Sequence, residues 1–177
     1  PRDRKWGARP KDGRDLLASG RPERRSDAMD AYETTCEVRW ADLDPNGHVR
    51  HTVFMDWATQ CRVEALAASG LTPRRFQELG CGPILFREET DYLREVDAGD
   101  RVTVSLEVVG ASSDWKHWRI RRRLARRDGV ACAVVMVRGA WFDLARRRVV
   151  APPAPIAEAF AAFPRGAAFA PIERGAA

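Results

Sequence analysis

Residues 42–70 read DLDPNGHVRHTVFMDWATQCRVEALAASG, a polar loop that runs directly into an amphipathic segment. In the second part, apolar side chains recur at spacings of three and four, which is the periodicity of a helix with one buried face. Gly70 stands where the C-cap of such a helix belongs. The stretch therefore predicts one long helix over 53–70, entered at its N-terminus from a polar loop.

The loop begins with D-L-D-P-N-G, which matches the first half of a calcium-binding loop. Such a loop needs a bidentate Glu at its twelfth position, but that position is Val53, and the ninth is Arg50. The segment before the loop is β-branched and aromatic, where an EF-hand has a helix. We therefore expect no metal site here. A plain turn remains the structural alternative, because Asp-Pro-Asn-Gly suits a turn at every position.

The order of elements along the chain predicts an α+β fold. A strand is expected over 32–40, before the loop, and a short helix between Thr72 and Gly80 follows the long one. Four segments with an alternating pattern come next, at 84–96, 101–110, 112–127 and 130–144. Such a sheet can wrap one helix and bury its apolar stripe, which leaves a face or an edge for a partner subunit.

Three regions are expected along the 177 residues. Residues 1–30 form a basic N-terminal extension, and residues 31–153 form the folded domain. Residues 154–177 form an Ala/Pro-rich C-terminal tail with a short helical stretch at 156–163.

Composition narrows the partners and the compartment. The net charge of +5 favours acidic partners such as phosphates or an acidic carrier protein. Basic residues alone are weak evidence for nucleic acid, which we do not expect as a partner. The four cysteines form no C-x-x-C pair, as is typical of free thiols. With no segment near the ~20 apolar residues of a membrane span, we expect a cytoplasmic protein, or one of an organellar matrix.

The polar loop carries residues suited to hydrolysis by water. Asp44 can orient or deprotonate a water molecule, Asn46 can hold the water or a carbonyl group, and His48 can act as a general base near neutral pH. The N-terminus of the helix that follows would stabilise a developing oxyanion. The sequence has no Gly-x-Ser-x-Gly elbow and no evident Cys–His pair, so attack by water is favoured over a covalent route.

The pattern VRWADLDPNGHV at 38–49, followed by FMDWATQCRVE at 54–64, resembles the hotdog-fold thioesterases. It is similar to the 4-hydroxybenzoyl-CoA thioesterase branch and its acyl-ACP thioesterase relatives, over about residues 32–153. The resemblance implies a hotdog fold, in which an antiparallel sheet wraps one long central helix. It also implies hydrolysis of an acyl-CoA or acyl-ACP thioester in a homodimer or homotetramer, with the site at the subunit interface. No cofactor is implied, because coenzyme A or phosphopantetheine enters as part of the substrate.

The resemblance also assigns roles to individual residues. The aspartate that matches Asp44 is the catalytic carboxylate of the 4-hydroxybenzoyl-CoA type, and the D-x-N-x-H set of plant acyl-ACP enzymes matches Asp44, Asn46 and His48. Related bacterial acyl-CoA thioesterases carry a His at the place of His51. Plant enzymes use a Glu on the strand after the helix, for which Asp91 is the nearest match. These residues are the expected catalytic and substrate-binding set.

Further substrate contacts are expected from Gly47 in the loop and from a row of arginines. Arg119, Arg121 and Arg123 alternate onto one face of their strand. This face is either a solvated basic surface or a clamp for the phosphates of coenzyme A or phosphopantetheine. Arg50 departs from the G-H-V-N-N of many relatives, which leaves the acyl and carrier preference open.

A different class of function fits the same fold. A hotdog domain can lose catalysis and serve as a binding or scaffold subunit in a larger assembly. The basic N-terminal extension and the Ala/Pro-rich tail would suit such a role. The Asp–Asn–His set favours an enzyme, because a scaffold has no need to keep it.

Overall fold

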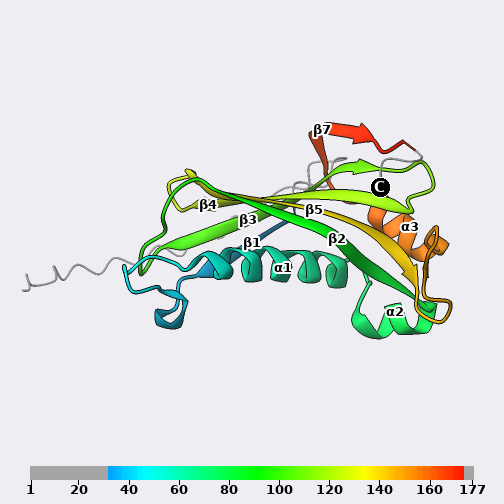
Figure 1. The fold of residues 1–177 in the computed structure, drawn as a ribbon, viewed down its shortest axis with the longest axis horizontal. Helices are drawn as coiled ribbons and strands as arrows, with labels where there is room; N and C mark the ends of the chain where they lie inside the picture. The colour runs from blue at the N-terminus through cyan, green and yellow to red at the C-terminus, as the bar shows by residue number, and fades with distance from the viewer. Residues whose placement is uncertain (1–31, 174–177) are drawn as a thin grey trace, which may run out of the picture.

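The computed structural model describes residues 32–173 and shows one long helix lying along one face of a curled sheet (Figure 1). The strands are β1 (Tyr32–Glu37), β2 (Cys81–Tyr92), β3 (Arg101–Ala111), β4 (His117–Arg126), β5 (Ala131–Asp143), β6 (Arg148–Val149) and β7 (Arg165–Pro171). The helices are α1 (His51–Ala68), α2 (Pro73–Leu79) and α3 (Ala154–Ala161), with a 3-10 turn η1 (Trp40–Asp42) before the loop. The predicted extension 1–30 lies outside the described residues.

The sheet has the order β1-β3-β4-β5-β2, and all four of these pairings are antiparallel. Its register places buried side chains in rows beneath the helix. Val104, Leu124 and Ala133 lie opposite one another on β3, β4 and β5, and all three are fully buried. Because side chains alternate along each strand, one face of the sheet points toward the core beneath α1 and the other points outward.

The core forms between this face and the apolar stripe of α1. Phe54, Trp57, Ala58, Cys61 and Ala65 are buried, at the helical spacing that the sequence predicts. Each large side chain buried here contributes about 1.5–3 kcal/mol relative to exposure. The sheet curls around α1, and the two elements bury each other.

Several boundaries differ from the sequence predictions, including both ends of β2, which spans Cys81–Tyr92 rather than 84–96. The first strand ends at Glu37 rather than residue 40, because the chain turns into η1. The long helix begins at His51, two residues earlier than predicted, after an extended Arg50. The third segment with strand periodicity enters β4 only at His117, because Trp115 adopts a left-handed conformation (φ 57°) in the turn before it.

Part of the predicted C-terminal tail packs against the domain. Ile156 and Phe160 of α3 are buried in the core, where the sequence predicts a short helix. The sequence did not predict β7, which pairs in parallel with β3. Gly110 makes this pairing possible, because a Cβ there would come within 2.9 Å of the carbonyl oxygen of Ala170.

Replacing Gly139 with Ala should destabilise the fold by at least the ~1–3 kcal/mol typical of an overpacked core. A Cβ at this position would lie 2.4 Å from the carbonyl oxygen of Ile84 and 2.4 Å from the Trp118 ring. Gly82→Ala is the matched control on β2, where the nearest atom would be Leu144 Cδ2 at 3.7 Å. Urea unfolding measures the free energy of unfolding of each variant. Equal values for Gly139→Ala and Gly82→Ala would contradict the packing argument.

Candidate active site

The polar loop closes on itself before it enters α1. Leu43 and Val49 form an antiparallel bridge, and the backbone N–H of Asp44 donates to the carbonyl oxygen of His48 at 2.8 Å. Gly47 has a left-handed conformation (φ 87°), which glycine adopts without strain. The loop is therefore a fixed turn that holds 44–48 together at one end of the helix.

A buried carboxylate anchors this turn. Asp42 Oδ2 accepts hydrogen bonds from the backbone N–H and the Nε of Arg39, at 2.9 and 3.0 Å, and Oδ1 accepts from Arg39 Nη2 at 2.7 Å. The carbonyl oxygen of Asp42 accepts from the N–H of Arg50 at 2.9 Å. The Arg39 side chain and backbone lower the pKa of Asp42 in spite of its burial. Asp42 thus ties both ends of the loop together.

Asp44 has one carboxylate oxygen inside the turn. Its Oδ1 accepts from the backbone N–H groups of Asn46 and His48, at 2.8 and 3.2 Å. Among the described residues, no hydrogen bond reaches Oδ2. Partial desolvation would raise the pKa of Asp44, but the two backbone donors and the Asn46 side chain outweigh it, and the pKa is lowered. Asp44 is therefore ionised at neutral pH, with one oxygen available to a ligand.

His48 lies beside two acidic side chains that follow β2. Its Nε2 is 3.6 Å from Glu95 Oε2 and 3.6 Å from Asp97 Oδ1, and its backbone forms an isolated bridge with Asp97. Both distances exceed those of a hydrogen bond. The half-exposed His48 ring can therefore turn toward a ligand or toward either carboxylate.

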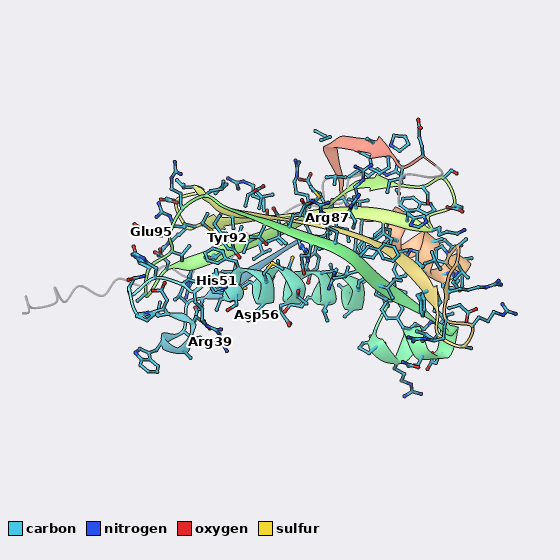
Figure 2. The ribbon with its side chains drawn as sticks, viewed as in Figure 1. Arg39, His51, Asp56, Arg87, Tyr92 and Glu95 are labelled. Carbon is cyan, nitrogen blue, oxygen red and sulfur yellow. The ribbon has the colours of Figure 1, made fainter. Side chains whose placement is uncertain are left out.

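The N-terminus of α1 opens next to this loop. Its N-cap, Arg50, makes no side-chain capping bond. The N–H of Val53 donates to the carbonyl oxygen of Arg50 at 3.0 Å, but the N–H groups of His51 and Thr52 have no partner among the described residues and remain available to a ligand. Tyr92 reaches over this end from β2, as Figure 2 shows, and its hydroxyl donates to the carbonyl oxygen of His51 at 3.2 Å. The Tyr92 ring makes an edge contact with Phe54, with centroids 5.6 Å apart. A carboxylate, an imidazole and free N–H groups thus share one end of the molecule.

The sequence matches the family model of the Thioesterase-like superfamily over residues 38–160. The chain belongs to this superfamily. Among curated protein sequences, none matches the chain.

Solved structures agree with this membership. The protein SAV2348 from Staphylococcus aureus, in complex with CoA, is 22% identical and has a TM-score of 0.69, with 79% of this chain and 90% of that chain covered. The 1,4-dihydroxy-2-naphthoyl-CoA thioesterase Slr0204 from Synechocystis is 19% identical, with a TM-score of 0.67 and coverage of 75% and 96%. A Thermus thermophilus thioesterase complexed with coenzyme A and Zn is 26% identical, with a TM-score of 0.62 and coverage of 76% and 96%. The predicted hotdog fold is confirmed.

Other predicted site residues of this thioesterase-like protein lie away from the loop. Asp91 is exposed on β2 and points to the opposite face from its neighbour Tyr92. Arg119, Arg121 and Arg123 share the outer face of the sheet, away from α1. Arg121 pairs with Glu107, and Arg123 donates to the carbonyl oxygen of Gly129. Within one chain, the structure does not bring these four residues to the Asp44 loop.

Three residues near the loop were not singled out in the sequence. Tyr92 and Glu95 fall within the predicted strand over 84–96, and Asp97 is the residue directly after it. Only the fold brings Tyr92 over α1, and Glu95 and Asp97 to His48. The sequence does show an aromatic residue close to acidic ones at the end of a strand. This pattern alone does not indicate which residues they contact in the fold.

Residues 32–173 contain neither a candidate metal-binding cluster nor a candidate membrane-spanning helix. Within that range, no group of three or more His, Cys, Asp or Glu side chains could hold a metal ion. No helix among these residues is long and apolar enough to cross a membrane.

Replacing Asp42 with Asn should lower the free energy of unfolding by about 1–3 kcal/mol at neutral pH, because an amide cannot accept both bonds of the Arg39 guanidinium. The folded-state pKa of Asp42 is lowered, so its stabilisation is fully present above the unfolded value of about 3.9. This stabilisation is lost as pH falls through the folded-state pKa of Asp42. The difference in free energy of unfolding between wild type and Asp42→Asn should therefore be constant from neutral pH to about 5 and shrink below about 4.

Urea titrations at a series of pH values measure this difference. Asp91→Asn is the matched control, because Asp91 is exposed and accepts no hydrogen bond among the described residues. A loss of the same size and pH dependence in Asp91→Asn would show that Asp42 does not anchor the loop.

Proposed function

We propose that this protein hydrolyses an acyl thioester by direct attack of water activated at Asp44. The observation that carries the proposal is the ionised Asp44 carboxylate, whose Oδ2 accepts no hydrogen bond among the described residues, in a fixed loop beside the N-terminus of α1. A carboxylate that keeps its charge can accept a proton from water. Membership of the Thioesterase-like superfamily supports a thioester as the bond that is broken.

In this mechanism the water oxygen bonds to the thioester carbonyl carbon while Asp44 accepts a proton from the water. The carbonyl oxygen gains negative charge, which the free N–H groups of α1 stabilise. The carbon–sulfur bond then breaks, and the thiolate receives the proton, so that the products are a free acid and a thiol. Asn46 holds the water or the carbonyl group, and His48 passes the proton from Asp44 to the departing thiolate.

We propose coenzyme A as the carrier ahead of an acyl carrier protein. Two of the similar solved structures contain coenzyme A, which supports this choice. The phosphates would bind the outer-face arginines, with Arg119 the strongest candidate of the three predicted. It lines a cavity of about 170 Å³ with Arg138 and His117, and neither arginine has an ion-pair partner among the described residues. Within one chain this cavity lies away from the Asp44 loop. We therefore propose that the loop of one subunit binds the thioester while the cavity of the other subunit binds the phosphates.

A homodimer formed through β2 is the assembly that we propose. β2 ends the strand order, so one of its edges is unpaired among the described strands. Large apolar side chains on β2 and directly after it are exposed, with exposed fractions of 40% for Leu85, 56% for Phe86 and 42% for Leu93. An exposed apolar edge strand is a template for pairing with another chain. A second copy on β2 would also cover the exposed Tyr92 near the loop.

Replacing Asp44 with Asn should lower the rate of thioester hydrolysis by the ~10²–10⁴-fold typical of a lost general base. Asn preserves the shape and can still accept the turn hydrogen bonds, but it carries no charge. Substrate binding should survive, since the defect lies in the chemical step. A panel of acyl-CoA thioesters with a free-thiol readout measures the rate, and His48→Ala is the companion variant.

The melting temperature and solution mass of Asp44→Asn should stay close to those of the wild type. Near-normal turnover of a good substrate by this variant would refute the role of Asp44 and move the assignment of the base to His48. A wild-type protein that hydrolyses no thioester would instead favour the alternative of a catalytically silent binding or scaffold subunit.

Light scattering should give the wild type about twice the 19.9 kDa mass of the chain, and Phe86→Lys should shift it toward the monomer. A charge on the unpaired edge of β2 opposes pairing with a second copy. Val130→Lys is the matched control, because Val130 is also exposed, with a fraction of 40%, but lies in the turn between β4 and β5. A monomeric wild type, or an unchanged mass for Phe86→Lys, would exclude this interface.

A further inference from the structure

We infer that Glu95 and Asp97 are positioning residues that hold the Nε2–H of His48, so that its Nδ1 carries the proton between Asp44 and the thiolate. Both acidic residues lie in the segment between β2 and β3, and Figure 2 shows Glu95 at the same end of the molecule as His51. The inference rests on the proposed function, because it assigns a route to the proton that Asp44 accepts from water. It adds two residues that lie far from the loop in the sequence.

The backbone holds this segment and the loop side by side. His48 and Asp97 form an isolated antiparallel bridge, and the N–H of Val49 donates to the carbonyl oxygen of Val96 at 2.8 Å. Both valines are buried, and Val96 is fully so. The N–H of Asp97 donates to Asp100 Oδ2 at 3.2 Å in the turn that follows. The His48 ring and the two carboxylates therefore extend from fixed backbone positions.

Two carboxylates converge on one ring nitrogen. Glu95 Oε2 and Asp97 Oδ1 each lie 3.6 Å from His48 Nε2. Neither carboxylate has another ion-pair partner or accepts a hydrogen bond among the described residues. Like charges that approach each other are unfavourable, and a donor placed between them offsets that cost. Among the described residues, the Nε2–H of His48 is the donor that the structure places beside both.

A small rotation of the His48 ring brings either carboxylate into hydrogen-bond range. The two distances exceed the usual N···O limit of about 3.2 Å by about 0.4 Å. Hydrogen bonds of catalytic groups are often long in a ligand-free protein and shorten when substrate binds. The two carboxylates are therefore in place to accept the Nε2–H when a substrate occupies the loop.

A hydrogen bond from Nε2–H fixes the tautomer of the ring. The other nitrogen, Nδ1, then has the free lone pair that can accept a proton. Nδ1 is the ring nitrogen nearer to the His48 backbone, whose N–H donates to Asp44 Oδ1 at 3.2 Å. The basic nitrogen is therefore the one closer to the carboxylate that takes the proton from water.

The proton is accounted for at each step of this route. Water gives one proton to Asp44 as its oxygen bonds to the thioester carbon, and protonated Asp44 passes that proton to His48 Nδ1. The ring is then an imidazolium, whose charge the two neighbouring carboxylates stabilise. When the carbon–sulfur bond breaks, Nδ1 gives the proton to the thiolate, and Nε2 keeps its own proton throughout. Glu95 and Asp97 gain no proton and touch no reacting atom.

Nitrogen-15 NMR of the imidazole rings tests the tautomer without any substrate. The sequence has three histidines, so variants at His51 and His117 assign the His48 signals. Neutral His48 should carry its proton on Nε2 alone, whereas Glu95→Ala/Asp97→Ala should exchange between the two tautomers. Both acidic side chains are exposed, so the double variant should fold. A proton on Nδ1 in the wild type, or the same tautomer ratio in both proteins, would overturn the inference.

Hydrolysis kinetics test the role of the pair. Glu95→Ala/Asp97→Ala should lower kcat by about 10- to 100-fold, as for the outer partners of metal-binding histidines. KM should not rise, because the carboxylates act through His48 and not on the substrate. Glu95→Asp/Asp97→Glu keeps both carboxylates and should retain most of the rate. Glu158→Ala is the matched control, because Glu158 is exposed on α3 at the other end of the molecule, and it should leave kcat unchanged.

The same substitutions in a His48→Ala background separate this inference from the proposed function. There, Glu95→Ala/Asp97→Ala should cause no further loss of kcat, because no ring remains to be positioned. A loss as large as in the wild-type background, or a rise in KM alone, would overturn the positioning role. A wild type that hydrolyses no thioester would overturn the proposed function, whereas the NMR measurement would still decide whether the two carboxylates hold His48.

Discussion

The burial of the α1 apolar face against the concave side of the sheet is the interaction on which the rest of the structure depends. Phe54 and Trp57 fill the space beneath the curl, while Ala58, Cys61 and Ala65 let the helix approach the strands closely. The sheet supplies matching rows of buried side chains from β3, β4 and β5. Because α1 packs along the whole concave face of the sheet, this packing fixes the positions of both ends of the helix. The loop before α1 and the turn into α2 are therefore fixed by the same packing.

The two ends of α1 differ in how polar groups are satisfied. At the N-terminus, Arg39 and the backbone satisfy the buried Asp42 carboxylate, and the loop is rigid as a result. At the C-terminal half, Arg62 and Arg122 keep buried N–H groups without partners among the described residues. A fully bonded network adds rigidity, whereas a partly bonded one costs stability.

Asp44 combines a structural and a proposed chemical role in one side chain. Its Oδ1 holds the turn through the N–H groups of Asn46 and His48, and its Oδ2 faces no donor among the described residues. The same hydrogen bonds that fix the loop also lower the pKa of the carboxyl group. A turn residue and a catalytic carboxylate are therefore compatible in this loop, although the sequence presented them as alternatives.

Sequence alone determined the elements whose signals are local. The three- and four-residue spacing predicted α1, Thr72 and Gly80 marked α2, and two-residue alternation predicted the long strands, because each pattern reflects which side of one element is buried. The loop residues were identified for the same reason, since 44–48 are neighbours in the chain. Only the tertiary structure decided the contacts between distant segments. These include β7 beside Gly110, Tyr92 over His51, Glu95 and Asp97 beside His48, and Arg62 beside Arg122. Such contacts depend on strand register and on the curl of the sheet around α1, which no short stretch of sequence encodes.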